Sequence, residues 1–418
     1  MRIIQGRSIN RELARLASRQ LLFSAETERA VARILKDVRA KGDSALQRYA
    51  KKWDGLGPKQ SLRVSEEELA NALASIPSSL RHALETAAHN IRKFAGWQKP
   101  QEFIRDIQPG LCVGQIIRPI DSVGCYVPGG RYPLPSSLLM TVIPAQVAGV
   151  RRIVVCSPSP APETLAAAAL LGVTEFYRIG GAQAIAALAY GTKSIAPVVK
   201  IVGPGNRFVT TAKKLVSFDC AIDMFAGPTE TIVVAENKEA GEAAFWASDL
   251  VAQAEHDPDT SVVFITSNGA LAKDAAAELK SRAKDNAIAR DSLRRNGLIF
   301  VTGSPEESIS VANAIASEHI TLSRDQLGSL NSAGSIFLGS YSPQSLGDYA
   351  AGPNHVLPTA CAARYRGGLS VFDYLKIITV QEVSREALVR IAPIVTTLAE
   401  AEGLRAHAES VRVRLTHA

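Results

Sequence analysis

A chain of 418 residues is too long for one hydrophobic core, so its length predicts two or more packed units. Hydrophobic residues make up 46% and charged residues 21% of the sequence, a balance that excludes a disordered or fibrous chain. The net charge is +7, but lysine and arginine are spread along the chain between acidic residues, which argues against nucleic-acid binding and suits an anionic small ligand such as a dinucleotide.

The N-terminal quarter of the chain is expected to be helical. Residues 26–52 carry apolar positions at helical spacing, and residues 66–98 continue the pattern. The short run RIIQG that precedes them fits either a strand or a docking arm.

From about residue 123, short β-rich runs alternate with alanine-rich helical segments, for example RIVVCSP followed by PETLAAAALLG. This alternation predicts βαβ units and a mainly parallel sheet. A second series begins at TIVVAE and continues through SVVFITS, GLIFVTG and GSIFLGS. We therefore expect an α/β fold with two Rossmann-like layers of mainly parallel sheet, whose similar rhythm suggests a duplication.

The C-terminal segment from Phe372 onward is expected to form helices with an amphipathic end in LAEAEGLRAHAESVRVRL. Such a tail is too short to form a core of its own. We therefore expect it to pack on another surface, such as that of a partner subunit.

The cysteines and the apolar runs indicate the cellular compartment. The five cysteines are odd in number, widely spaced and without a CxxC pair, so they indicate neither a disulfide framework nor a thiolate zinc site: Cys112, Cys125, Cys156, Cys220 and Cys361. The opening residues lack an apolar signal core, and no stretch of apolar residues is long enough to span a membrane. A cytoplasmic protein is expected.

Several polar residues stand where they could bind a metal ion. Gln253 and His256 are three residues apart at the end of a predicted helix, so they share a face and could reach one ion, or could simply cap a turn. Asp348 and His355 lie in a stretch rich in glycine and proline after a predicted strand, a place for ligands or for an ordinary turn. His407, taken alone, is typical of a surface helix.

Two further features could carry chemistry. Glu318 and His319 are adjacent and supply a carboxylate and an imidazole, both able to accept protons near neutral pH, although such neighbours also occur by chance. The glycine-rich stretches GCYVPGG, GGAQAIAALAYG and VGPGN stand at strand-to-helix junctions, where they serve either phosphate binding or tight turns. None of them is GxGxxG, so the ordinary dinucleotide fingerprint is absent.

Taken together, these stretches resemble the histidinol dehydrogenase family from about residue 30 to residue 413. The blocks that carry the resemblance occur in the family's order: GDSALQRYAKKWDG, SVGCYVPGG, GGAQAIAALAYGT, KIVGPGN, IDMFAGPTE, DLVAQAEHDPD, SEHITL, SAGSIFLG, GDYAAGPNHVLPT and EGLRAHAESVRVR. So many matches in the right order are not a chance result.

The resemblance implies a set of site residues. One catalytic zinc ion per subunit would be bound by Gln253, His256, Asp348 and His407. The zinc would hold the substrate through its imidazole and amino nitrogens, so the substrate would lie against these four ligands. The residues implied to complete the substrate site are Thr229, His319, His355 and Glu402, and those implied to contact NAD are Tyr126, Gln183 and Asn206.

The resemblance also implies the reaction, which belongs to histidine biosynthesis. L-histidinol would be oxidised through bound L-histidinaldehyde to L-histidine, with two successive hydride transfers to NAD. His319 would accept the alcohol proton, and Glu318 would activate the water that attacks the aldehyde. The family is a homodimer whose C-terminal tail crosses to the other subunit, so Glu402 and His407 would complete the neighbour's site.

The resemblance and the patterns together predict four parts. They are an N-terminal arm (1–20), a main α/β domain with the zinc and catalytic residues (21–122 plus 231–370), an inserted NAD-contacting α/β domain (123–230) and a helical tail that reaches the partner subunit (371–418).

Three positions depart from the family pattern. Thr229 stands in GPTE where the family commonly has GPSE, Ala95 replaces a histidine of FHxxQ, and Thr321 stands in EHIT where the family often has EHLE. None of them removes a proposed ligand or base. They leave open a paralogue that oxidises another amino or sulfonated alcohol with the same zinc and NAD. A non-catalytic scaffold that binds metal or NAD is the alternative from another class, disfavoured because all four ligands and both bases occur together.

Overall fold

The computed structural model describes residues 1–17, 24–129, 132–236 and 242–416. The chain divides into two compact units, one formed by Met1–Gln98 and Asp121–Tyr374 and the other by Lys99–Ile120 and Leu375–Ala418. The predicted α/β fold class with mainly parallel sheets is confirmed. Gly130, the last residue of the GCYVPGG stretch, and residues 18–23, where the predicted arm ends, lie outside the described residues. The predicted domain boundaries stay a prediction.

The N-terminal region is helical after one short strand. RIIQG supplies strand β1 (Arg2–Gln5), which pairs in parallel with β11 (Leu298–Val301). The helices that follow are α1 (Ser8–Ala17), α2 (Ala25–Lys41), α3 (Asp43–Trp53), α4 (Glu66–Ser75) and α5 (Ser78–Gln98). Side chains fix where two of them begin, since Ser24 caps α2 and Ser65 forms a capping box with Glu68 on α4.

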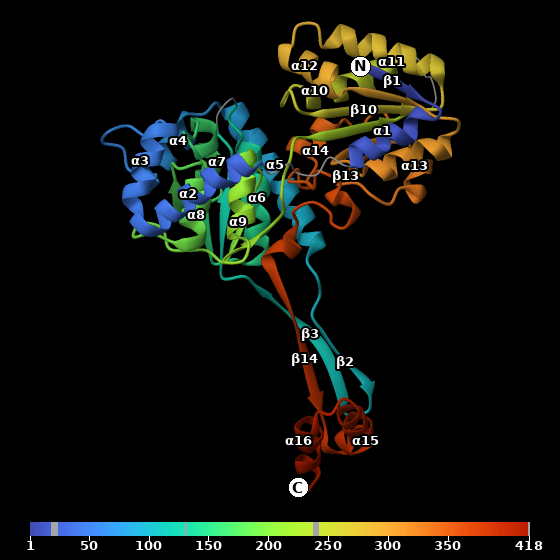
Figure 1. The fold of residues 1–418 in the computed structure, drawn as a ribbon. Coiled ribbons are helices and arrows are strands. Elements are labelled where there is room, and N and C mark those ends of the chain that lie inside the picture. The colour runs from blue at the N-terminus through green and yellow to red at the C-terminus, as the bar shows by residue number, and fades with distance from the viewer. Residues whose placement is uncertain (18–23, 130–131, 237–241, 417–418) are drawn as a thin grey trace. The chain divides into compact units, whose positions relative to one another are not determined.

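A five-stranded, fully parallel sheet has the order β6-β5-β4-β7-β8. Its strands are β4 (Ser122–Tyr126), β5 (Arg152–Cys156), β6 (Glu175–Tyr177), β7 (Lys200–Val202) and β8 (Ala221–Ile222). Its helices are α6 (Pro135–Ala148), α7 (Pro162–Leu170), α8 (Gly181–Tyr190) and α9 (Arg207–Val216), and α8 and α9 pack with α2 over one apolar core (Figure 1). The strand order reverses between β4 and β7, and ligands of such sheets bind at the carboxyl ends of these two strands.

A six-stranded, fully parallel sheet has the order β1-β11-β10-β9-β12-β13. Its remaining strands are β9 (Glu230–Val234), β10 (Ser261–Thr266), β12 (His319–Leu322) and β13 (Ser335–Leu338). Its helices are α10 (Glu242–Ala254), α11 (Gly269–Arg282), α12 (Ala287–Asn296), α13 (Pro305–Ile315) and α14 (Gln344–Tyr349). Apart from β1, the strands follow the same order as those of the five-stranded sheet.

Short 3₁₀ helices lie between the later elements of the first unit. They are Arg324–Ser329, Ala362–Arg364 and Val371–Tyr374. The last of them packs against α5 and α6.

The second unit is a three-stranded antiparallel sheet with two helices. Its strands are β2 (Phe103–Gln108), β3 (Leu111–Pro119) and β14 (Leu375–Val383), in the order β14-β3-β2, and its helices are α15 (Arg385–Ala401) and α16 (Arg405–Thr416) (Figure 1). The helical tail is therefore confirmed for α15 and α16. The expectation that helix begins near Phe372 is wrong for Leu375–Val383, because the run of β-branched residues KIITV forms a strand on β3.

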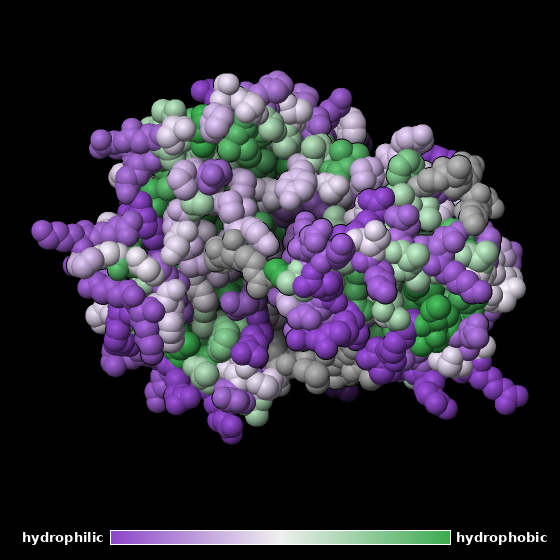
Figure 2. All heavy atoms as spheres, turned by 90° about the horizontal axis from the view of Figure 1, so that it is seen from above, coloured by the Kyte–Doolittle hydropathy of each residue, from purple (hydrophilic) through white to green (hydrophobic). Residues whose placement is uncertain are grey.

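Among the described residues, no helix has both the length and the apolar character needed to cross a bilayer. The face drawn in Figure 2 is mostly hydrophilic, and its hydrophobic residues form small separate patches. Scattered apolar residues of this kind are ordinary on a folded protein and identify no docking surface by themselves.

Candidate active site

The carboxylate of Asp348 joins two of the predicted site residues. Its Oδ2 accepts a hydrogen bond from Nε2 of Gln253 over 2.8 Å, and its Oδ1 lies 3.2 Å from Nε2 of His319. Gln253 lies on α10, His319 opens β12 and Asp348 lies on α14. The sequence places Asp348 in a loop, but the structure places it in the short helix α14, where Gln344 to Tyr349 complete one and a half turns.

The site lies at the amino ends of the central strands of the six-stranded sheet. His319 pairs with Thr231 at the start of β9, and Glu318 directly precedes β12. Ligand sites of open α/β sheets usually lie at the carboxyl ends of the strands. Here α14 follows β13 and returns to the opposite edge, which brings Asp348 to the start of β12.

Glu318 is almost fully buried, with 7% of its surface exposed. Its Oε2 accepts a hydrogen bond from the backbone N–H of Glu230 over 3.2 Å, and the hydroxyl of Thr229 also bonds to this carboxylate. Burial raises the pKa of Glu318 to about 7, because the charged form loses water that these bonds only partly replace. A carboxylate with such a pKa can accept a proton near neutral pH.

His319 is 3% exposed and lies against Glu318 and Asp348. Burial by itself would lower the pKa of this imidazole, but the two carboxylates outweigh it and raise the pKa above its ordinary value. An ionised carboxylate only accepts hydrogen bonds, so Nε2 carries the proton that faces Asp348. The other nitrogen, Nδ1, is buried, makes no hydrogen bond of good geometry among the described residues and lies 3.9 Å from Oε2 of Glu318. A weaker contact of the ring with the backbone of Glu230 also helps to raise the pKa of the imidazole.

Asp348 is the ionised member of the cluster. Burial would raise its pKa, but the hydrogen bond from His319, the charge that the His319 imidazole carries when it is protonated, and the bond from Gln253 hold the pKa below its usual value. Its backbone carbonyl oxygen accepts a hydrogen bond from Nδ1 of His355 over 2.7 Å. Burial lowers the pKa of His355, so this imidazole is neutral.

One residue next to this cluster, Ser137, is not indicated by the sequence. Nε2 of His355 lies 3.2 Å from the hydroxyl of Ser137, near the start of α6. Nearby, the side chain of Asn354 donates to the carbonyl oxygen of Met140 over 2.6 Å. No motif marks Ser137 in the sequence, and only the long-range contact identifies it.

His256 lies beyond the end of α10 and is exposed, whereas Gln253 lies within α10 and is 2% exposed, so the two do not share a helical face as the spacing predicts. His256 still lies close enough to His355 to affect its pKa. Among the described residues, no group of three or more His, Cys, Asp or Glu side chains is arranged to hold a metal ion. Gln253 and Asp348 are in direct contact through the amide nitrogen of Gln253, and an amide oxygen and a carboxylate are donors of the kind that borderline metals accept.

Two of the predicted NAD contacts are buried next to the five-stranded sheet. Tyr126 ends β4, and its hydroxyl accepts a hydrogen bond from the N–H of Gly181 over 3.1 Å. Gln183 on α8 donates from Nε2 to Oδ2 of Asp54 over 3.1 Å, and the same oxygen accepts from the N–H of Gly180 over 3.0 Å. The N–H groups of Gly180 and Gly181, at the start of α8, are thus bonded to side chains of the chain itself.

The third predicted contact, Asn206, is exposed and caps α9 through bonds from the N–H groups of Phe208 and Val209. It follows β7 and so stands, with Tyr126, at the point where the strand order of this sheet reverses.

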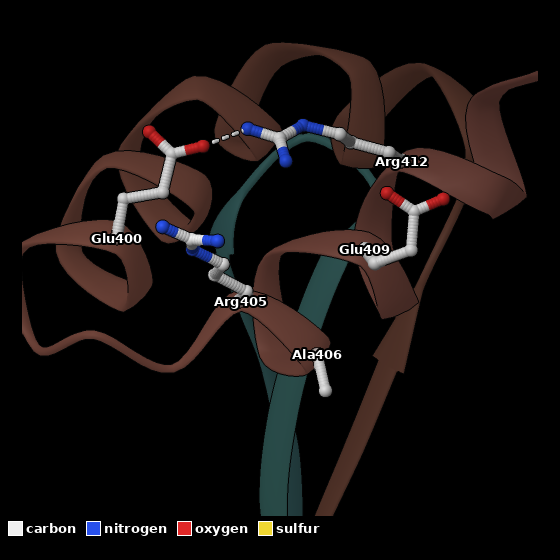
Figure 3. A pocket seen from close by; sticks show the side chains of 5 residues that line it. All are labelled: Glu400, Arg405, Ala406, Glu409 and Arg412. Atoms are coloured by element: carbon white, nitrogen blue, oxygen red, sulfur yellow. Dashed lines mark hydrogen bonds and ion pairs between the residues drawn. The ribbon is translucent and has the colours of Figure 1, made fainter.

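The remaining predicted residues lie in the second unit. Glu402 and His407 are both exposed, on the connection from α15 to α16 and on α16 itself. Close to them, α15 and α16 form an open groove of about 650 Å³ (Figure 3). Charged side chains line the groove, with Glu400 bonded to Arg412 and the guanidinium of Arg405 pointing toward Glu400.

Comparison with known proteins gives the family. The family model described as histidinol dehydrogenase matches residues 17–415. The histidinol dehydrogenase of Methanothermobacter thermautotrophicus is 44% identical and aligns over 97% of both chains, and that of Gluconobacter oxydans is 46% identical over 91% of both. The crystal structure of histidinol dehydrogenase from Elizabethkingia anophelis superposes with a TM-score of 0.94 at 36% identity, covering 99% of this chain and 98% of that one. The chain therefore belongs to the histidinol dehydrogenase family and is an oxidoreductase of histidine biosynthesis.

Proposed function

We propose that this chain performs the family's reaction with Glu318 and His319 as its proton acceptors, L-histidinol as substrate and NAD as oxidant. The observation that carries the proposal is the geometry of the buried pair: Oε2 of Glu318 lies 3.9 Å from Nδ1 of His319, whose Nε2 lies 3.2 Å from Oδ1 of Asp348. Their surroundings raise the pKa of both groups. Pairs of titratable groups whose pKa values are shifted by their surroundings are typical of acid–base sites.

In the first oxidation, His319 accepts the proton of the substrate's hydroxyl group. Since Nε2 donates to Asp348, the nitrogen left to accept a proton is Nδ1. Asp348 fixes this tautomer and stabilises the imidazolium that forms. As the O–H bond breaks, the carbinol carbon gives up a hydride and becomes the aldehyde carbon.

In the second oxidation, Glu318 takes a proton from water while the water oxygen bonds to the aldehyde carbon. The hydrated aldehyde then loses the second hydride and becomes a carboxylate. One alcohol, one water and two oxidised NAD molecules thus give one carboxylate, two reduced NAD molecules and three protons. Burial of Glu318 serves this step, because it makes the carboxylate basic enough to act near neutral pH.

Gln253, His256, Asp348 and His407 would hold the zinc ion. The contact between Gln253 and Asp348 supports this assignment, because two of the four side chains lie within hydrogen-bond distance of each other. A zinc ion bound by such oxygen and nitrogen donors supplies a Lewis acid that holds and orients the substrate. Thr229 and His355 lie next to Glu318 and Asp348 respectively, which supports their proposed contact with the substrate.

Tyr126, Gln183 and Asn206 would contact NAD, the cofactor of this family of dehydrogenases. The support for this site is topological, because Tyr126 ends β4 and Asn206 follows β7, the two strands at which the order of the five-stranded sheet reverses. NAD, when bound there, supplies the hydride acceptor for both oxidations.

The active form would be a homodimer in which Glu402 and His407 complete the substrate and zinc sites of the other subunit. Both side chains are exposed on the second unit, so neither is committed to the interior of its own subunit. The five cysteines, all of them described, form no disulfide with one another, which suits the reducing cytoplasm that we propose as its compartment.

The test is an assay of the purified protein with L-histidinol and NAD, following the absorbance of reduced cofactor. The proposal expects two molecules of reduced NAD and one of L-histidine for each L-histidinol, with no free aldehyde. A panel of other amino and sulfonated alcohols serves as the comparison. Turnover of one of these in place of L-histidinol would identify a paralogue, and no turnover of any, with zinc bound, would identify a scaffold.

A further inference from the structure

A buried side-chain amide stands at the start of the helix that carries Asp348. Gln344 is the first residue of α14 and is fully buried. Asp348 follows it four residues later, so the two side chains lie on the same face of the helix. No motif in the sequence marks Gln344, and the proposed reaction gives it no role.

The amide of Gln344 has a partner for each of its groups. The hydroxyl of Thr231 on β9 donates to Oε1 over 2.7 Å. Nε2 donates to the hydroxyl of Thr321 on β12 over 3.1 Å and to the carbonyl oxygen of Ile232 over 3.3 Å. Thr231 and Thr321 are themselves buried, at 0% and 3% exposed. These bonds tie the first turn of α14 to β9 and to β12, the strand that Glu318 precedes and His319 opens.

The backbone of Gln344 is held as well. Pro343 precedes α14 and gives it no side-chain cap, but the N–H of Gln344 bonds to the carboxylate of Asp249 on α10. Asp249 lies one turn before Gln253 on the same helix. The two helices are therefore joined at two successive turns, first by Asp249 with Gln344 and then by Gln253 with Asp348.

A helix as short as α14 depends on such bonds. It has six residues, too few to be stable by its own hydrogen bonds. It also lies close to the sheet, because a Cβ added to Gly347 would come within 2.7 Å of the ring of Phe337, and that ring packs against His319 with 6.0 Å between the centroids. The direction of the Asp348 carboxylate thus follows from where the first turn of α14 is fixed.

Thr321 supplies the strand end of this network. Its hydroxyl is neutral and accepts from Nε2 of Gln344 over 3.1 Å. A buried amide and a buried hydroxyl satisfy each other without any charge to desolvate. In this chain, Thr321 and Gln344 form a matched pair.

We propose that Gln344, held by Thr231 and Thr321, is a positioning residue that aims the Asp348 carboxylate at the metal. The inference rests on the proposed function, in which Asp348 is a zinc ligand. Gln344 touches neither metal nor substrate in this arrangement and acts only through the helix that it anchors. Partners behind a metal ligand typically contribute 10-fold to 100-fold to metal affinity.

The experiment measures the affinity of the full-length protein for Zn²⁺ by competition with a chelator, together with kcat and KM for L-histidinol. Gln344→Leu keeps the size of the side chain and removes its bonds, and we expect zinc affinity to fall about 10-fold to 100-fold. Thr321→Val removes one acceptor and should weaken zinc binding by a smaller factor in the same direction. Gln344→Glu keeps an acceptor for Thr231 and should recover part of the affinity. With saturating zinc, kcat should return toward that of the unchanged protein.

Ser292→Ala is the matched control. Ser292 is fully buried in the same α/β layer, and its hydroxyl donates to the carbonyl oxygen of Thr260 over 3.0 Å, away from Asp348. It should lower the thermal unfolding midpoint without changing zinc affinity. Equal zinc affinity of Gln344→Leu, Thr321→Val and the unchanged protein would overturn the inference, and if Gln344→Leu fails to fold, Thr321→Val decides alone. Asp348→Ala separates the two claims, because zinc affinity that survives this change would instead contradict the ligand assignment of the proposed function.

Discussion

Gln253 donates a hydrogen bond to Asp348 over 2.8 Å, although 95 residues separate them in the chain. The other oxygen of the same carboxylate faces His319. Asp348 therefore contacts both a proposed metal ligand, Gln253, and the proposed base, His319. We expect a change to the base to lower the rate of turnover and a change to a ligand to lower zinc binding, and the two defects can be measured separately.

Replacing His319 by glutamine is expected to lower kcat about 10²-fold to 10⁴-fold, the usual contribution of a positioned general base. Zinc content should remain near one ion per subunit, because the proposed ligands are intact. His256→Ala should show the reverse pattern, with a loss of bound zinc that added zinc partly restores. The measurements are kcat with L-histidinol and zinc content of the dialysed protein. A His319→Gln variant with normal turnover would exclude His319 as the base.

The sequence indicated most of the site residues but not their arrangement. The spacing of Gln253 and His256 and the adjacency of Glu318 and His319 are local, so the pattern shows them directly. The contacts of Gln344, Ser137 and Asp54 join segments far apart in the chain, and no periodicity encodes such pairs.

The fold was predictable to a similar extent. The alternation of strands and helices gave two parallel layers, because each βαβ unit is a local pattern. The position of the site at the amino ends of β9 and β12 was not predictable, since it depends on α14 returning across the sheet. Strand β14 was missed because its pairing partner β3 lies more than two hundred residues earlier.

A mixing experiment tests whether subunits share their sites. Two inactive variants, His407→Ala and His319→Gln, would be unfolded together and refolded, or co-expressed with different tags. If His407 completes the neighbour's site, each mixed dimer has one site with both defects and one site with none. Random pairing should then restore about a quarter of the activity of the unchanged protein. Refolding each variant alone is the control, and a mixture as inactive as its components would place both residues in the same subunit's site.

A buried ion pair supports the loop that carries Asn206. Lys213 and Asp223 are 2% and 0% exposed in their side chains and are bonded to each other. Asp223 also accepts from the N–H of Gly203 over 2.7 Å, and Lys213 donates to the carbonyl oxygen of Gly203 over 2.9 Å. Gly203 has a φ of +108°, and a Cβ there would lie 2.1 Å from the carbonyl oxygen of Tyr126.

Replacing Lys213 by methionine would leave the charge of Asp223 buried without its partner, and we expect the free energy of unfolding to fall by about 3–5 kcal/mol. Asp223→Asn should lower the free energy of unfolding by a similar amount, because it leaves the charge of Lys213 buried without its partner. The double variant should lose clearly less free energy of unfolding than the sum of the two single losses, because it leaves neither charge buried without a partner. Denaturant unfolding of the four proteins gives this coupling, and strict additivity would show that the two charges do not depend on each other.

The carboxylate of Asp54 predicts a pH dependence of stability. Burial raises the pKa of Asp54, and the bonds from Gly180 and Gln183 only partly oppose this. The folded protein then holds a proton on Asp54 at pH values where the unfolded chain has lost it. The contribution of this group to stability is therefore full below the unfolded pKa of about 3.9 and is lost as the pH rises through the raised folded pKa.

Comparison with Asp54→Asn isolates this effect, because other groups titrate equally in both proteins. Burial also raises the pKa values of the neighbouring Tyr126 and Cys156, so neither of them ionises in the same range. The free energy of unfolding, measured in urea from pH 4 to pH 7, should fall with pH in the unchanged protein relative to the variant. Each tenfold preference of the folded state for the protonated group corresponds to about 1.4 kcal/mol. A difference that grows with pH would mean that the bonds from Gly180 and Gln183 outweigh burial and that the charged form is the one the fold prefers.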